Sequence, residues 1–285
     1  MRRRVFLGLC LCVSAAVLAE GPPKSAVEAL AAAWLAQRPA PGFAAGMSMD
    51  EAVRVREAYT ALIDRDLGPV AGYKAALTNP AIQRRFGWDQ PVRGTLYARM
   101  ILSGGAKVPA AFGSHPVWEA DLVAVVGDAE KLMAARTPLE ALAGIQAFRP
   151  FIELPDLVFE PQVKLDGPSL CAINAAARLG VLGPPVRLPP TQASADRLAA
   201  MRVEALDGTG KRLALGTGSD ILGNPLNAVL WLAASLRAEG RKLRAGEILS
   251  LGSYSPLLTP APGLTATVRY TGLDDRPVEV SVRFE

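Results

Sequence analysis

Two acidic residues that could work as a pair, Glu119 and Asp121, precede the apolar run 122–126, in which three of the five residues are valine. Such a run is typical of a strand that is buried on both faces. Residues two positions apart on a strand point to the same face, so the two carboxylates are expected side by side. Two like charges about 4 Å apart repel by roughly 4 kcal/mol at an effective dielectric near 20. The pair therefore indicates a bound cation, or else a strand end that emerges into water, where both acids are solvated.

A third acid, Glu153, stands inside the apolar run 150–155, 34 residues after Glu119. An acidic side chain in a buried run is seldom left without a partner. If a neighbouring strand carries it, Glu153 joins the first pair, and three hard oxygen ligands suit Mg²⁺ or Mn²⁺. The alternative is a buried ion pair between Glu153 and Lys164 or an arginine.

A second group of reactive residues lies upstream. Lys74 stands in the weakly polar segment 71–80, where burial would suit its amine to proton transfer or to pairing with an anionic substrate. Asp89 follows on an expected loop ahead of 94–96. A lysine or an aspartate on a loop can also be simply solvated, so neither residue identifies a site alone.

Helices and strands predicted from the pattern must position these residues. The expected helix starts, each a capping residue followed by Pro or by Glu three positions later, are Ser25, Ser48, Asn79, Thr137 and Asn224. The expected strands, besides 122–126, are 201–206, 211–215, 265–270 and 278–284. Helices come first and a sheet-rich body follows, which favours an α+β fold over regular βαβ winding.

Composition and charge limit the possible classes of protein. The chain has 285 residues, half of them hydrophobic and 20% charged, which excludes a disordered chain and fits one large domain or two small ones. Without residues 1–19 the chain has 28 basic and 27 acidic residues, so its net charge is close to zero. It has no cluster of basic residues of the kind that would indicate nucleic-acid binding. Cys171 and His115 are then the single Cys and the single His, which excludes a Cys₄ or Cys₂His₂ zinc site.

The N-terminal segment has the parts of a secretory signal peptide. Arg2–Arg4 are followed by the uncharged apolar run 5–19, which ends in Val17-Leu18-Ala19 before Glu20. The run is shorter than the ~20 residues of a membrane-spanning helix, so a membrane anchor is the second interpretation. We therefore expect export to the periplasm, cleavage after Ala19, and no membrane contact of the mature chain.

Taken together, these segments resemble the 2-keto-4-pentenoate hydratase branch of the fumarylacetoacetate hydrolase superfamily. The similar segments follow the order and approximate spacing of that family over most of the chain after about Met49. They are 72–74, 77–78, 89–91, 94–96, 119–126, 151–156, 174–176, 223–229 and 243–248.

The resemblance implies a fold and an organisation. The expected fold is a mixed, rolled β-sandwich with peripheral helices and an N-terminal helical segment. The expected division is a signal peptide over 1–19, the helical segment over 20–68 and a hydratase-like catalytic domain over 69–285. A homo-oligomer is expected as well.

The resemblance also implies a site. Glu119, Asp121 and Glu153 would hold a divalent Mg²⁺ or Mn²⁺ ion, which a small 2-oxo acid substrate chelates. Lys74 and Asp89 would be catalytic, moving protons or holding the substrate anion. The residues implied as substrate contacts are Thr78, Asn174 and Ser253.

The reaction implied is the ketonisation of a 2-hydroxydienoic acid and the addition of water to it. Related members cleave acylpyruvates or decarboxylate 2-oxo diacids. Asp121 stands where the family usually has Glu, and Ile173 replaces an acid that commonly precedes the Asn-Ala pair. His115, just before Pro116, is expected to start a strand rather than act as a base, which favours a hydratase or lyase over a hydrolase. Cys171 is expected in the core. A catalytically silent relative that binds a small carboxylate is the alternative from another class.

Overall fold

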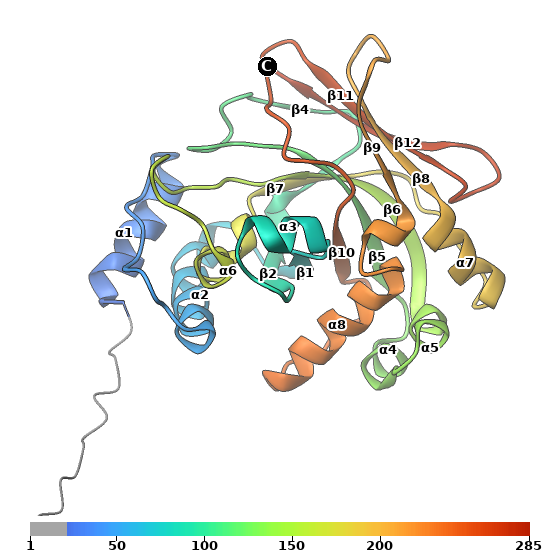
Figure 1. Cartoon of the computed structure of the whole chain (residues 1–285), viewed down its shortest axis with the longest axis horizontal. Coiled ribbons are helices and arrows are strands. Elements are labelled where there is room, and N and C mark those ends of the chain that lie inside the picture. Colours follow the sequence, from blue (N-terminus) through green and yellow to red (C-terminus); the bar gives the residue numbers. More distant parts are fainter. Residues whose placement is uncertain (1–21) are drawn as a thin grey trace, which may run out of the picture.

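The computed structural model describes residues 22–285, so the expected signal peptide, 1–19, lies outside the described residues. A seven-stranded sheet has the order β2-β1-β10-β5-β6-β7-β3, and a five-stranded sheet has the order β4-β12-β11-β8-β9 (Figure 1). The strands of the larger sheet are β1 (Val70–Ala76), β2 (Val92–Tyr97), β3 (Ile101–Ser103), β5 (Glu119–Val126), β6 (Ile145–Leu154), β7 (Leu179–Leu182) and β10 (Ile248–Ser253). Those of the smaller sheet are β4 (Ala106–Val108), β8 (Arg202–Leu206), β9 (Arg212–Thr217), β11 (Thr265–Thr271) and β12 (Val278–Phe284).

Helices surround the two sheets. They are α1 (Lys24–Leu35), α2 (Met49–Ile63), α3 (Pro80–Arg85), α4 (Ala129–Ala134), α5 (Pro138–Ala143), α6 (Gly167–Ala172), α7 (Gln192–Ala200) and α8 (Pro225–Ala238). In Figure 1, α1 and α2 lie together on the left, and α8, α4 and α5 lie together below the sheets. None of the helices among residues 22–285 has the length and apolar character needed to cross a bilayer.

Both sheets are mixed in strand direction. In the larger sheet β1 runs parallel to β10 and antiparallel to β2, while β5 runs antiparallel to both β10 and β6. In the smaller sheet β4 runs parallel to β12, and the other pairs are antiparallel. The predicted α+β fold with mixed sheets and peripheral helices is therefore confirmed.

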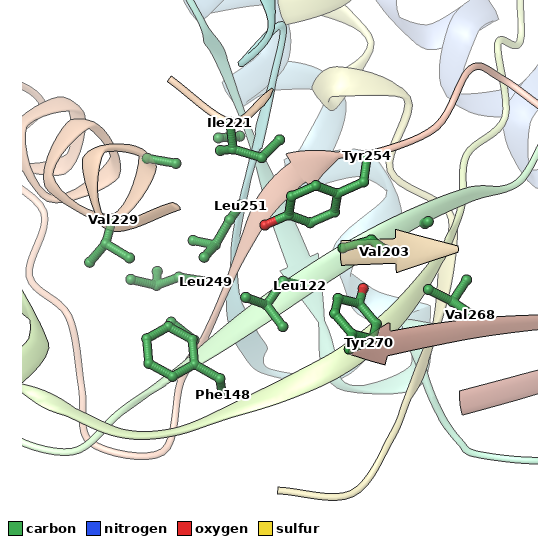
Figure 2. Close-up of a cluster of buried hydrophobic side chains, with 14 of the residues drawn as sticks. Leu122, Phe148, Val203, Ile221, Val229, Leu249, Leu251, Tyr254, Val268 and Tyr270 are labelled. Atoms are coloured by element: carbon green, nitrogen blue, oxygen red, sulfur yellow. The ribbon is translucent and has the colours of Figure 1, made fainter. Parts of the chain in front are cut away.

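Strand β5 is buried on both faces, as its valine-rich sequence predicts. Leu122 belongs to the apolar cluster between the two sheets, where Figure 2 shows it near Phe148 and Tyr270. The next residue, Val123, belongs to a second apolar cluster that also includes Tyr59 of α2. The helical segment at the N-terminus thus packs on the face of the larger sheet opposite the smaller one.

The helix starts follow the capping residues with one exception. Ser48, Thr137 and Asn224 accept hydrogen bonds from backbone N–H groups in the first turns of α2, α5 and α8. Ser25 does not cap α1, because that helix begins one residue earlier, at Lys24, after Pro23. Pro23 is the N-cap residue and makes no side-chain capping hydrogen bond, so the expected capping box is absent.

Candidate active site

A cavity lies beside β1, β10, β5 and β6, four adjacent strands of the larger sheet. Its polar lining consists of Lys74, Thr78, Asn79, Arg85, Glu119, Glu153, Ser253 and Ser255. Its larger apolar lining residues are Leu77, Ile82, Phe86, Pro155, Leu157, Leu170 and Leu257. Helix α3 contributes Ile82 and Arg85 to the lining although it buries none of its own residues. The cavity thus combines acids and a lysine from strands with a wall made by an exposed helix.

Lys74 points from β1 to the carboxylate of Glu153. The lysine side chain is almost fully buried, its Nζ forms an ion pair with Glu153 Oε1, and it donates a hydrogen bond to Ala175 O at 2.8 Å. Lys164, which the sequence offered as the partner of Glu153, is exposed instead. A buried ion pair therefore exists, but the cation is the lysine predicted to be catalytic.

Glu119 faces Glu153 across two paired strands. The two residues are direct partners in the antiparallel β5–β6 ladder, and both line the cavity. Burial, together with the charge of Glu153, raises the pKa of Glu119 to about 7, while Lys74 and the Ser253 hydroxyl oppose the rise. A proton or a further cation beside Lys74 would therefore relieve the repulsion between these two carboxylates.

Asp121 is directed to β10 rather than to the cavity. Its Oδ1 accepts hydrogen bonds from the backbone N–H groups of Leu251 (3.1 Å) and Gly252 (3.0 Å), and its Oδ2 accepts one from the Ser250 hydroxyl. The side chain is fully buried and does not line the cavity. Burial and the charge of Glu153 raise the pKa of Asp121 well above its usual value. Asp121 is therefore not solvated at a strand end, and that alternative is wrong for this residue.

A bulge in β10 supplies the two N–H groups that Asp121 uses. The β10–β5 register shifts between Ser250 and Ser253. Within the bulge Gly252 has a φ of +113°, and a Cβ on it would lie 1.8 Å from Thr78 Oγ1. Only glycine fits this conformation and this close approach. The bulge therefore brings Thr78 against the strand and turns consecutive N–H groups toward one carboxylate.

The other predicted site residues are divided between the cavity and its surroundings. Thr78 and Ser253, expected as substrate contacts, line the cavity. Asn174, the third, is fully buried and is not part of the lining. Asp89, expected to be catalytic, is exposed and lies outside the lining. The structure thus brings Lys74 together with the acids but does not bring Asp89 to them.

Three further features of the site have weak signals in the sequence. The hydrogen bond from Lys74 to the Ala175 carbonyl could not be predicted, because a backbone acceptor is not marked by any side chain in the sequence. Arg85 follows Arg84, and nothing local tells which of the two arginines reaches a cavity. Ser255 is a serine in a serine-rich segment, and its hydroxyl accepts a hydrogen bond from Ala120 N at 3.0 Å.

His115 and Cys171 both lie outside the cavity lining. The backbone N–H of His115 donates to Asp156 Oδ1 at 2.8 Å, and its side chain is exposed outside the cavity lining. The thiol of Cys171 is buried and lies 3.8 Å from Arg56 Nη1. Neither residue is placed to attack a molecule in the cavity.

The cavity acids fit a divalent cation. Two carboxylates, Glu119 and Glu153, share the cavity with one lysine. The buried Oε1 of Glu153 accepts no hydrogen bond of good geometry from the described residues, although the Lys74 ammonium lies against it. Oxygen donors with unsatisfied lone pairs are the ligands that Mg²⁺ and Mn²⁺ prefer. Among residues 22–285 no three acidic, His or Cys side chains already converge as a complete ligand set, because the Asp121 carboxylate is engaged with β10.

Comparison with known proteins places the chain among enzymes of 2-oxo acid metabolism. No family model matches the chain. It is 34% identical to the 2-keto-4-pentenoate hydratase of Burkholderia vietnamiensis over 210 residues, which cover 72% of this chain and 75% of the relative. It is 32% identical to 2-keto-4-pentenoate hydratase 1 of Dechloromonas aromatica over 225 residues, 79% of this chain and 82% of the relative.

Solved structures share the fold. The structure of 4-oxalocrotonate decarboxylase from Pseudomonas putida G7, complexed with magnesium and adipate, matches with a TM-score of 0.79 and 25% identity, covering 92% of this chain and 97% of the other. Fumarylpyruvate hydrolase from Pseudomonas aeruginosa, in complex with Mn²⁺ and pyruvate, matches with a TM-score of 0.53 and 15% identity over 76% of this chain and 91% of the other. The second match, at this identity, shows the fold alone.

Proposed function

Because the chain belongs to the 2-keto-4-pentenoate hydratase family of the fumarylacetoacetate hydrolase superfamily, we propose that it is a metal-dependent hydratase or lyase of a small 2-oxo acid. One observation carries the proposal. Glu119, Glu153 and Lys74, which come from three strands, share one cavity in which the two carboxylates face each other. The identity to named hydratases supplies the reaction class.

A divalent cation belongs to this proposal, since the matched decarboxylase and hydrolase structures hold Mg²⁺ and Mn²⁺. Glu119 and Glu153 would hold the ion. Asp121 would be the third ligand by exchanging part of its hydrogen bonds with β10 for the cation. When bound, the cation supplies positive charge against the negative charge that develops on a 2-oxo acid during reaction. We propose Mg²⁺ or Mn²⁺ as the ion.

The side chains of the cavity have separate tasks. Lys74, held by Ala175 O and Glu153, has a third N–H left with which to bind the substrate anion or to move a proton. The hydroxyls of Thr78 and Ser253 orient the substrate from the lining. The 2-hydroxydienoic acid first ketonises to a 2-oxo acid that keeps one conjugated C=C bond. Water then adds across this bond, which gives a 4-hydroxy-2-oxo acid. Asp89 takes no part in this proposal, because it is exposed and outside the lining.

A second candidate is the decarboxylation of a 2-oxo diacid at the same site. The matched structure with a TM-score of 0.79 is a decarboxylase, and one relative at 29% identity is a 4-oxalocrotonate decarboxylase from Pseudomonas sp. The cationic Arg85 in the lining suits an acid with a second carboxylate. An acylpyruvate hydrolase is favoured less, because His115 lies away from the cavity.

The experiment is metal analysis of the purified protein followed by turnover of a panel of 2-oxo acids with and without a chelator. We expect one divalent ion per chain, activity that is lost with the chelator and restored with Mg²⁺ or Mn²⁺, and loss of turnover in Lys74→Ala. Lys164→Ala is the matched control, since Lys164 is exposed and outside the lining. Binding of 2-oxo acids by a metal-loaded parent protein that turns over none of them would favour the catalytically silent relative instead.

We also propose that residues 1–19 direct export to the periplasm. The support is the sequence alone: three arginines, an apolar run and a terminal Val17-Leu18-Ala19. From the family we further propose a homo-oligomer, which light scattering on the mature protein tests.

A further inference from the structure

Three consecutive residues beside Lys74 have a left-handed backbone. The φ angles of Asn174, Ala175 and Ala176 are +57°, +52° and +57°. Residues with a Cβ rarely adopt this region, and a run of three stores strain that the surroundings must hold in place. This strained turn lines the cavity through Ala175 and Ala176. Two things must therefore be explained: what holds the turn in place, and what it does at the cavity.

The side chain of Asn174 holds the left-handed turn in place. It is fully buried, its Oδ1 accepts a hydrogen bond from Thr95 N at 2.7 Å, and its Nδ2 donates one to Thr95 O at 2.9 Å. The amide thus pairs with β2 as a neighbouring strand would. The approach is close, because a Cβ on Gly94 would lie 2.4 Å from Asn174 O. Asn174 and the absence of a side chain at Gly94 together fasten the turn to β2.

The turn places the Lys74 ammonium at the cavity. Lys74 and Gly94 are partners in the β1–β2 ladder, so the turn packs directly beside the lysine. The carbonyl that the strained backbone turns toward it, Ala175 O, accepts from Lys74 Nζ at 2.8 Å. A carbonyl takes one N–H without neutralising the charge, which leaves the ammonium cationic and directed at Glu153 and the cavity.

We propose that Asn174 is a positioning residue, which holds the left-handed turn so that Ala175 O fixes the Lys74 ammonium at the cavity. This inference rests on the function proposed for Lys74. It assigns to Asn174 no contact with the substrate, because both polar ends of its amide are used by Thr95. The residue acts through the backbone that follows it.

The test compares Asn174→Ala with Asn224→Ala. Asn224 is the matched control, since its amide also makes two bonds to backbone, with Leu226 N and Ala195 O, but caps α8 away from the cavity lining. Asn174→Ala is expected to lower kcat about 100-fold with little change in KM, because a displaced reacting group loses that much. The rate at which acetic anhydride modifies Lys74, measured by mass spectrometry, is expected to rise several-fold, because the ammonium loses its hydrogen bond to Ala175 O. Asn224→Ala is expected to lower the unfolding temperature alone.

A second variant covers the case in which Asn174→Ala does not fold. Asn174→Asp keeps the tolerance for a left-handed backbone and the acceptor for Thr95 N but removes the donor for Thr95 O, so it should show the same two effects in weaker form. Unchanged kcat and unchanged Lys74 modification in a folded variant would overturn the inference. If the parent protein turns over no 2-oxo acid, the proposed function fails, and Lys74 modification still decides the role of Asn174.

Discussion

Glu119 and Glu153 are direct partners across the antiparallel β5–β6 ladder, and both side chains line one cavity. This pairing brings two like charges together from positions 34 residues apart in the chain. Burial and the repulsion from Glu153 raise the pKa of Glu119 to about 7, against 4.5 for the free side chain. The folded site therefore favours the uptake of a proton or a cation.

We first predict a pH dependence of stability in the metal-free protein. Between pH 4.5 and about 7 the folded protein holds a proton on Glu119 that the unfolded chain has released. The free energy of unfolding therefore falls as the pH rises through this range, with Glu119 contributing up to about 3 kcal/mol of the fall. Urea unfolding in chelator at about pH 5 and about pH 8 measures the effect. Glu119→Gln should be less sensitive to pH than the parent, and an equal or larger sensitivity would contradict the prediction.

Asp121→Asn tests the third ligand of the proposed metal site. The amide oxygen can keep the bonds from Leu251 N and Gly252 N, and the Ser250 hydroxyl can turn to accept from the new amide group. We expect a change in stability of about 1 kcal/mol or less, and a loss of Mn²⁺ affinity of about 10-fold or more, measured by titration calorimetry. Unchanged affinity in the folded variant would show that Asp121 serves β10 alone.

Arg85 and Arg84 form a natural comparison for substrate preference. Both are exposed in the last turn of α3, but only Arg85 lines the cavity. A guanidinium that pairs with a second carboxylate contributes about 1.5–3 kcal/mol. Arg85→Gln should therefore lower kcat/KM for 2-oxo diacids by about 10-fold or more and leave monocarboxylic 2-oxo acids unaffected. Arg84→Gln should change neither, and equal losses in both variants would rule out a specific role for Arg85.

Gly94→Ala should be costly because of the approach to Asn174. The new Cβ would lie 2.4 Å from Asn174 O and 3.0 Å from Lys74 Cγ. Forcing these groups apart is expected to lower the free energy of unfolding by about 2–3 kcal/mol, or the unfolding temperature by roughly 5–10 °C. Gly104→Ala is the control, because its nearest neighbour would lie at 3.6 Å. A similar unfolding temperature for the two variants would mean that the turn can move away from β2 freely.

Export makes a prediction about the mature N-terminus. If residues 1–19 are removed, the protein recovered from the periplasm begins at Glu20, which intact-mass measurement shows directly. Ala19→Arg should block cleavage and leave the longer chain. Recovery of the full chain in the cytoplasm would contradict the proposed location.

Local pattern predicted β5 and the smaller-sheet strands β8, β9, β11 and β12, but it did not identify β1 or β10 as strands, and most of the cavity lining was not predicted. The valines of 122–126 predicted a doubly buried strand, and two acids on one face followed from the period of that strand. The family resemblance connected Lys74 with those acids, and the structure places all but Asp121 at one cavity. The buried strand and its two aligned acids are properties of a single segment, which a short-range pattern can encode, whereas the meeting of Lys74 with those acids is not.

Relationships between segments could not be predicted in the same way. The direction of the Asp121 carboxylate depends on a bulge in β10, 130 residues later in the chain. Asn174 was expected to touch substrate, but its amide is occupied by the backbone of Thr95, and a backbone partner has no side-chain signature. Asp89 was expected in the site from its motif, whereas the loop that carries it leaves it exposed.

Helix α3 lines the cavity while burying none of its own six residues, whereas the acids and the lysine stand on central strands. Replacing the exposed Arg85 on this helix therefore removes little packing energy, unlike changes on the strands, whereas Ile82 packs against the second apolar cluster. Arg85 is therefore the position on α3 at which substrate preference can change with little loss of stability. Libraries aimed at retargeting the enzyme should begin on that helix and leave the strands intact.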